Sequence, residues 1–310
     1  MATQPLQVAC AADHGYLAYC GTMLHSLLGF HPGAVVNFLH DATLPARPLS
    51  RLGALVERQG GRWNPLAVDP VRIAGLPRMR RIPPLMWYRI LLPELLPDQD
   101  RVLYLDVDTL VVDDLAPLWT IPLEDHVVAA VNNVLDESQG DRAQALGIPR
   151  SAGYFNSGVL LFNLERMRRQ DTTRAIVDYA RAHAADLLWP DQDGLNAIMA
   201  TERLALHPRW NCQNTLFYWD VDRFFPPGEA AAAAAQPAIL HFEGPRHAKP
   251  WHPDNTHPYR SAWWQHRRAA GLRGPWRGEL KRQLQWLRSR LLRTGPRPAA
   301  PRRAPGTSTG

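Results

Sequence analysis

The first seventy positions of the chain alternate between short apolar runs and segments whose apolar residues recur at helical spacing. Apolar runs at 7–12, 35–40 and 63–68 have the length of strands, whereas 17–29 and 49–59 carry apolar residues three to four positions apart. Strands that alternate with helices predict a largely parallel sheet covered by helices on both faces.

The same alternation continues through the middle of the chain. Residues 85–96 have helical spacing, and the four consecutive apolar residues at 102–105 are typical of a strand buried on both faces. Further strands are predicted at 127–131 and 157–163, with an amphipathic helix at 171–186. The alanine run at 230–235 is interpreted as a low-complexity surface loop. The expected fold class is therefore α/β.

Composition limits the class of protein. The 310 residues are 45% hydrophobic and 21% charged, which is typical of a soluble globular chain with a sizeable core. No apolar run approaches the roughly 20 residues of a membrane-spanning helix. The first residues lack the features of an export signal, so we expect a cytoplasmic protein. Three cysteines, Cys10, Cys20 and Cys212, without a C-x-x-C pair, indicate reduced thiols in or near the core.

Charge is distributed unevenly around a net value of +6. Residues 260–310 hold 13 Lys and Arg against the single acid Glu279, a net +12, so residues 1–259 hold 22 against 28, a net −6. Leucines at helical spacing run through the basic part, at Leu280, Leu284, Leu287 and Leu291. We therefore predict three parts: a globular domain at 1–259, a basic aromatic segment at 260–293 that associates with membranes, and a disordered tail at 294–310.

The basic segment predicts an anionic partner. Indole rings favour the headgroup layer of a bilayer and basic side chains favour an anionic leaflet, which suits peripheral attachment to the inner face of the cell membrane. The indoles concerned are Trp263, Trp264, Trp276 and Trp286. A solvated charged helix is the alternative. No RNA- or DNA-binding signature accompanies the basic residues, which argues against nucleic acid.

The sharpest local candidate for chemistry is Asp106-Val107-Asp108, at the end of the predicted strand 102–105. Residues two apart on an extended chain face the same side, so both carboxylates project together beyond the carboxyl end of the strand. Hard divalent cations such as Mn²⁺ or Mg²⁺ prefer oxygen ligands of this kind. The alternative for such a string is a solvated turn.

His241 ends another apolar run and would turn the paired carboxylates into a mixed nitrogen and oxygen site suited to Mn²⁺. Gly244 follows, where backbone can approach a ligand closely. Lys249, one of only two lysines, offers a cation for phosphate. His241 and Lys249 also have structural interpretations, as a hydrogen-bonded core histidine and a solvated surface lysine. Asn156 and the group around Asp191 could likewise serve only as helix caps or loop residues.

Seven such motifs together resemble glycosyltransferase family 8, and in particular its bacterial lipopolysaccharide galactosyl- and glucosyltransferases. They occur in family order between about residues 6 and 252, as Ala11-Ala12-Asp13, Tyr88-Arg89, Val102 to Thr109, Phe155 to Asn163, Asp191-Gln192-Asp193, Arg209-Trp210-Asn211, and His241 to Gly244 with Lys249-Pro250-Trp251. The resemblance implies a GT-A (Rossmann-like) fold and a retaining enzyme that moves a hexose from a UDP-sugar to a saccharide, possibly lipid-linked.

The resemblance also implies a role for each matching residue. Asp106, Asp108 and His241 match the ligands of Mn²⁺, with Mg²⁺ as a second possibility, and Asp191 and Gln192 match the catalytic positions. The implied substrate-binding residues are Ala11, Asp13, Arg89, Asp106, Asn156, Asp191, Gln192, Gly244 and Lys249. Two departures stand out, because the loop 245–248 is two residues longer than usual and the stretch 81–84 lacks the usual hydroxyl groups.

Two other classes of function use some of the same residues. A metal-dependent nucleotidyltransferase or phosphohydrolase would use the paired carboxylates but has no need for Asn156, Asp191 and Gln192. A non-catalytic nucleotide-sugar binding protein would be stabilised by UDP-sugar without turnover. Neither accounts for the ordered set of motifs as well as a glycosyltransferase does. The identity of the donor sugar and of the acceptor hydroxyl does not follow from the residues.

Overall fold

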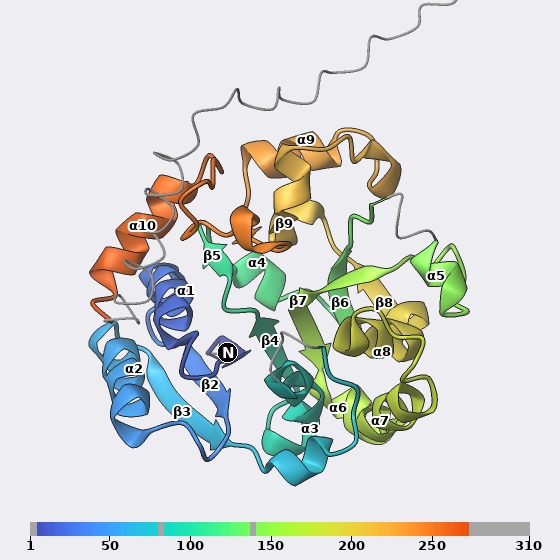
Figure 1. Ribbon diagram of the computed structural model, residues 1–310, viewed down its shortest axis with the longest axis horizontal. Coiled ribbons are helices and arrows are strands. Elements are labelled where there is room, and N and C mark those ends of the chain that lie inside the picture. The colour runs from blue at the N-terminus through green and yellow to red at the C-terminus, as the bar shows by residue number, and fades with distance from the viewer. Residues whose placement is uncertain (1–4, 80–83, 137–140, 273–310) are drawn as a thin grey trace, which may run out of the picture. The chain divides into compact units, whose positions relative to one another are not determined.

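A computed structural model describes residues 5–79, 84–136 and 141–272 of the chain. Its largest sheet has seven strands in the order β3-β2-β1-β4-β7-β6-β8 (Figure 1). These strands are β1 (Gln7–Ala11), β2 (Val35–His40), β3 (Arg62–Ala67), β4 (Arg101–Leu105), β6 (Val128–Asn132), β7 (Phe155–Asn163) and β8 (Arg203–Ala205). Strand β7 runs antiparallel to both β4 and β6, and the other pairs are parallel. The prediction of a mixed, mostly parallel sheet is confirmed.

A second, three-stranded sheet lies beyond the end of β4. It consists of β5 (Thr109–Val111), β10 (Ile239–His241) and β9 (Cys212–Gln213), with β10 in the middle. Strand β5 follows β4 after only three residues, and its antiparallel pairing with β10 sets Thr109 opposite His241. This pairing brings two segments that are far apart in sequence to the carboxyl end of β4.

Helices cover both faces of the large sheet, as predicted (Figure 1). The side chains of β1 alternate between two apolar clusters, with Val8 and Cys10 in one cluster and Ala9 and Ala11 in the other. The first cluster includes residues of α1 and α2, and the second includes residues of α6, α7 and α8. The α-helices are α1 (Leu17–Phe30), α2 (Ala46–Arg58), α3 (Leu92–Leu95), α4 (Ala116–Trp119), α5 (Arg142–Ala145), α6 (Leu164–Arg169), α7 (Thr172–Ala182), α8 (Pro190–Met199), α9 (Glu229–Ala235) and α10 (Arg260–Ala269).

Two elements differ from the sequence predictions. The alanine run at 230–235 is not a loop but most of helix α9, because alanine has the highest helix propensity and Ala230 and Ala233 are buried in the core. The predicted helix at 85–96 is largely a 3₁₀ helix, η2 (Pro84–Leu91), followed by the single turn of α3. The three cysteines are free and buried, as predicted.

Helix α10 belongs to the body of the fold. The ring of Trp263 has no exposed surface and packs against the stacked rings of Tyr19 and Trp251, with centroid separations of 6.0 and 5.3 Å. The interpretation of Trp263 as an indole at a membrane interface is therefore wrong, because its ring fills the core between α1 and α10. The remaining part of the predicted basic segment, 273–293, and the predicted tail, 294–310, lie outside the described residues.

No helix within the described ranges combines the length and the apolar character that crossing a membrane requires.

His257 gives the fold a predicted dependence on pH. Its imidazole is 4% exposed, lies among the rings of Phe217 and Phe242, and accepts a hydrogen bond from the N–H of Tyr259 over 3.1 Å. Burial lowers the pKa of His257 to about 4. Because the unfolded imidazole binds a proton near pH 6.5, this residue's contribution to stability is complete above that pH and is lost as the pH falls toward 4, by about 3 kcal/mol.

Urea unfolding of the natural chain and of the His257→Gln variant checks this prediction. We expect the difference in unfolding free energy between the two proteins to shrink between pH 7 and pH 4.5, because only the natural chain has this buried imidazole to protonate. A difference that stays constant over that range would contradict the assignment.

Candidate active site

Asp106 and Asp108 lie immediately beyond the end of β4. The N–H of Asp106 donates to the carbonyl of Gly158 in β7 over 2.8 Å. The chain then turns, because the N–H and the hydroxyl of Thr109 both donate to the carbonyl of Asp106, over 3.2 and 2.8 Å. One side-chain ligand atom each from Asp106, Asp108 and His241 lies within 4.8 Å of the others. The structure therefore brings the three predicted metal ligands together.

Asp106 is held by a buried arginine. Nη2 of Arg89 lies 3.0 Å from Oδ1 of Asp106 and 3.5 Å from Oδ2 of Asp191, and Nη1 donates to the carbonyl of Ser157. The hydroxyl of Tyr104 donates to the same oxygen of Asp106 over 3.1 Å. Burial by itself lowers the pKa of Arg89, but the two carboxylates hold that pKa above its usual value. The guanidinium therefore stays charged and fixes two predicted site carboxylates side by side.

Asp108 meets two basic groups. Its Oδ1 lies 3.4 Å from Nε2 of His241, and its Oδ2 accepts a hydrogen bond from Nζ of Lys249. The same ammonium donates to the carbonyl of Phe242 over 2.7 Å. Burial raises the pKa of Asp108, but Lys249 and His241 hold it well below its usual range, so the carboxyl is an anion. The longer loop 245–248 thus still delivers Lys249 to the site.

Helix α10 fixes the segment that carries Lys249. The carbonyl of Pro250 accepts hydrogen bonds from Nε of Arg260 over 3.1 Å and from Nε1 of Trp264 over 3.2 Å. The carbonyl of Ala248 accepts a further bond from Nδ2 of Asn255 over 2.8 Å. The backbone on both sides of Lys249 is therefore anchored to the body of the fold.

A chain of amides orients His241. Nδ2 of Asn211 donates to Oδ1 of Asn156 over 2.9 Å, so Oδ1 of Asn211 is the atom that faces Nδ1 of His241, 2.9 Å away. A neutral imidazole in this setting carries its proton on Nδ1 and presents the lone pair of Nε2 toward Asp108. Asn156 in turn donates to Oδ1 of Asn133 over 2.8 Å. Asn156 therefore helps to orient His241, a predicted metal ligand.

Gln192 lies in the first turn of α8, where its amide is held at both ends. Oε1 accepts a hydrogen bond from the N–H of Ser157 over 2.9 Å, and Nε2 donates to the hydroxyl of Tyr154 over 3.1 Å. Tyr154 donates to the buried carboxylate of Asp193, which also receives two bonds from Arg142, over 3.0 and 2.6 Å. Oε1 of Gln192 keeps a second lone pair for a ligand.

The other predicted site residues end or follow strands. Ala11 ends β1, the parallel neighbour of β4, and Oδ1 of Asp13 accepts a hydrogen bond from the N–H of Tyr16 over 3.0 Å. Gly244 follows β10 with a φ of +88°, a conformation that favours glycine.

Several residues that hold the site were not predicted from the sequence in these roles. Asn211 and Asp193 stand in motifs that the sequence contains, but no spacing shows that an amide meets His241 or that a carboxylate anchors Tyr154. Tyr104 appeared only as an apolar strand residue, although its hydroxyl reaches Asp106. A tyrosine two residues before a candidate ligand on one strand face is a usable signal, because the two side chains point the same way.

The donor set fits a divalent cation. Two carboxylates supply the oxygen ligands that hard cations prefer, and the imidazole of His241 adds a nitrogen ligand, which favours Mn²⁺ over Mg²⁺. The partners around them hold both carboxylates and the ring in place. Among the described residues these three side chains form a group whose ligand atoms lie close enough together to share one cation.

Comparison with known proteins gives consistent matches over most of the chain. A sequence model described as glycosyl transferase family 8 matches residues 7–255. General stress protein A of Bacillus subtilis is 29% identical over 269 residues, covering 84% of this chain and 92% of that protein. Lipopolysaccharide glucosyltransferase WaaO of Escherichia coli is 27% identical over 256 residues, covering 80% and 73%.

The solved structures agree with these sequence matches. The galactosyltransferase LgtC, solved in complex with donor and acceptor sugar analogs, superposes with a TM-score of 0.77 at 30% identity, and the match covers 88% of this chain and all of that one. The apo structure of the bifunctional glycosyltransferase WbbM has a TM-score of 0.72 at 18% identity, covering 90% of this chain and 52% of that one, and shows the fold alone.

Proposed function

This chain belongs to glycosyltransferase family 8, and we propose that it transfers galactose or glucose from a UDP-sugar to a saccharide acceptor with retention at the anomeric carbon. The observation that carries the proposal is the convergence of Asp106, Asp108 and His241, with Asp191 tied to Asp106 through Arg89. The solved galactosyltransferase at 30% identity supports a hexose as the transferred group.

Asp106, Asp108 and His241 would hold Mn²⁺, or Mg²⁺ in its place. When bound, the cation stabilises the negative charge that develops on the UDP leaving group. Lys249, beside Asp108, and the backbone at Gly244 bind the diphosphate in this proposal. Ala11 and Asp13 bind the uridine.

In this proposal the donor sugar lies against Arg89 and the first turn of α8, which carries Asp191 and Gln192. Arg89 binds sugar hydroxyls, because its guanidinium is already fixed by Asp106 and Asp191 and costs little further ordering. The anomeric carbon becomes positively charged as the leaving group departs. Asp191 and the free lone pair of Gln192 Oε1 would stabilise that charge, with Gln192 on the face opposite UDP. Asn156 would bind the donor sugar, and it also orients His241 through its hydrogen bond with Asn211.

A donor screen tests the proposed function. The full chain is incubated with Mn²⁺ and single UDP-sugars without any acceptor, and the released UDP is measured. We expect slow release from UDP-galactose or UDP-glucose and none after chelation. Release of a product other than UDP would indicate a nucleotidyltransferase or phosphohydrolase, and thermal stabilisation by UDP-sugars without turnover would indicate a binding protein. Either result would overturn the proposal.

We propose that the acceptor belongs to a cell-surface glycan such as lipopolysaccharide. Two curated relatives support this, the glucosyltransferase of Escherichia coli above and lipopolysaccharide 1,3-galactosyltransferase of Salmonella typhimurium, which is 24% identical over 263 residues, covering 81% of this chain and 74% of that protein. A lipid-linked acceptor would be met at the inner face of the cell membrane. Residues 273–310, with 10 Lys and Arg against one acid, provide a basic segment for that surface.

Removal of residues 273–310 is expected to abolish binding to anionic membranes. A cut after Leu272 keeps all of α10, including the buried Trp263, so the body of the fold is retained. We expect the full chain, but not the truncated one, to sediment with phosphatidylglycerol vesicles at low salt and to be released at high salt. Phosphatidylcholine vesicles are the control. Equal sedimentation of the two chains with the anionic vesicles would refute the role of the segment.

A further inference from the structure

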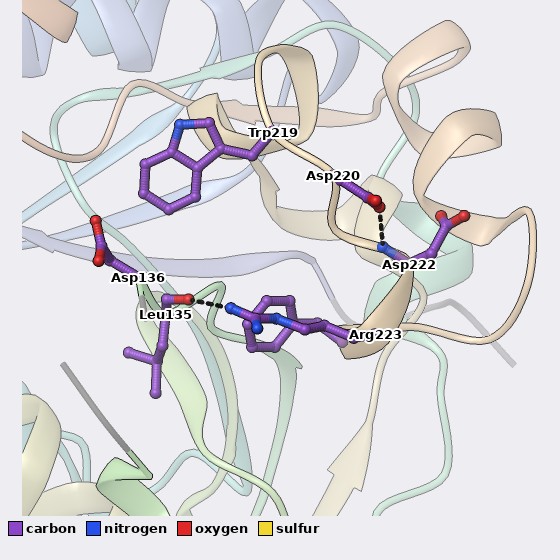
Figure 2. A pocket seen from close by; sticks show the side chains of 7 residues that line it. Leu135, Asp136, Trp219, Asp220, Asp222 and Arg223 are labelled. Atoms are coloured by element: carbon purple, nitrogen blue, oxygen red, sulfur yellow. Dashed lines mark hydrogen bonds between the residues drawn. The ribbon is translucent and has the colours of Figure 1, made fainter. Parts of the chain in front are cut away.

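A cleft outside the cluster of metal ligands is lined by an exposed indole and several carboxylates. It has a volume of about 540 Å³, within the range of small-molecule sites. Trp219 is 48% exposed, and Figure 2 shows its ring on the opposite side of the opening from Arg223, with Asp136 at the edge between them. The remaining lining residues are Leu135, Asp220, Asp222 and Phe224.

This cleft continues toward the candidate active site. A second hollow of about 500 Å³ shares Leu135, Asp136, Arg223 and Phe224 with the first and extends to Asn132, Asn133, Gly153 and Tyr154. Asn133 accepts the hydrogen bond of Asn156, and Tyr154 accepts that of Gln192. A chain of sugars whose terminal unit lies beside Gln192 would therefore extend along this cleft toward Trp219.

The walls of the cleft are bonded to each other and to the active site. Nδ2 of Asn132 donates to the carbonyl of Phe224 over 2.8 Å, and Nη2 of Arg223 donates to the carbonyl of Leu135 over 3.3 Å. Nε2 of Gln213, two residues after Asn211, donates to the carbonyl of Asn132 over 2.7 Å. A preformed cleft of this kind loses little conformational entropy when it binds a ligand.

The chemistry of the lining selects the ligand. An exposed indole offers a flat apolar surface to the C–H face of a pyranose, and carboxylates accept hydrogen bonds from its hydroxyls. Four carboxylates and two guanidinium groups line the two hollows, a net charge of −2, in Asp136, Asp141, Asp220, Asp222, Arg150 and Arg223. This negative charge disfavours the binding of a ligand that carries a phosphate or a carboxylate.

We propose that this cleft binds the second sugar unit of the acceptor, with Trp219 as the stacking surface, and that it selects a unit without phosphate or carboxylate. The inference rests on the proposed function, because it takes the sugar beside Gln192 to be the one that is glycosylated. The acceptor is then a neutral or amino-substituted oligosaccharide.

An array of immobilised oligosaccharides tests this inference with the full chain. The array carries matched neutral, amino, phosphorylated and uronate-containing glycans. We expect binding to neutral or amino glycans of two or more units, a loss of at least about tenfold in Trp219→Ala, and no loss in Phe30→Ala, an exposed aromatic at the end of α1. Replacement of both Asp220 and Asp222 by Asn should raise binding to the acidic glycans.

The proposal is overturned if Trp219→Ala binds the same glycans equally well, if the glycans bound best are acidic, or if no glycan is bound. UDP release from the donor in the absence of acceptor separates this inference from the function on which it rests. Trp219→Ala should keep that release unchanged, because the cleft does not contact the donor residues Arg89 and Lys249. If the natural chain released no UDP from the donor, the proposed function itself would be refuted.

Discussion

Asp108→Asn is expected to lower metal-dependent UDP release by about a thousandfold, a loss on the scale of removing a principal electrostatic group from an active site. The substitution removes the negative charge that faces His241 and Lys249 but keeps the shape of the side chain. The amide oxygen still accepts a hydrogen bond from the Lys249 ammonium, so the fold should remain intact. Initial rates across a Mn²⁺ titration, together with a thermal melt, measure both effects.

Asp98→Asn is the matched control, because Asp98 is an exposed carboxylate between α3 and β4. This variant should retain the activity and the melting temperature of the natural chain. If Asp108→Asn kept more than about a tenth of the natural activity at saturating Mn²⁺, Asp108 would not be a ligand of an essential cation.

Gly158→Ala should disable the site through a single methyl group. A Cβ at Gly158 would lie 2.2 Å from Cε1 and 2.8 Å from Nε2 of His241, closer than real Cβ contacts occur. The imidazole has no free direction in which to move, because Nδ1 is bonded to Asn211 and Nε2 faces Asp108. We expect a loss of at least about a hundredfold in activity and a comparable weakening of Mn²⁺ binding, because a metal ligand that is turned out of position binds the cation poorly.

Calorimetric titration with Mn²⁺ in the presence of UDP measures the second effect directly. Gly29→Ala in α1 is the control, since a Cβ there would meet no atom within 4 Å. Unchanged Mn²⁺ affinity in Gly158→Ala, with the protein folded, would show that His241 does not need its observed position to bind the cation.

The central strands of the sheet could be predicted because they are buried on both faces. A run such as Val102 to Leu105 has to be continuously apolar, and such runs are visible without any knowledge of partners. Helix α9 was missed because a repeated composition was taken to indicate a loop, whereas alanine favours a helix when one face is buried. Trp263 was misplaced because basic neighbours do not reveal which face of α10 packs on α1.

The candidate site was predictable only in part from local pattern. The placement of Asp106 and Asp108 follows from the period of a strand, but the approach of His241 depends on the pairing of β5 with β10 across about 130 residues. That long-range contact leaves no local signal. His241 could be named as a candidate because it ends an apolar run, but its match to the metal ligands came from the family resemblance. The amide chain from Asn156 through Asn211 to His241 depends on tertiary packing and could not be predicted from spacing.

A crystal structure of the full chain grown with Mn²⁺ and UDP, with anomalous diffraction recorded at the manganese edge, would locate the cation directly. We expect one manganese peak in contact with carboxylate oxygens of Asp106 and Asp108, with Nε2 of His241 and with the diphosphate. A peak elsewhere, or a peak at the carboxylates with His241 turned away from it, would show that these three residues do not form the metal site.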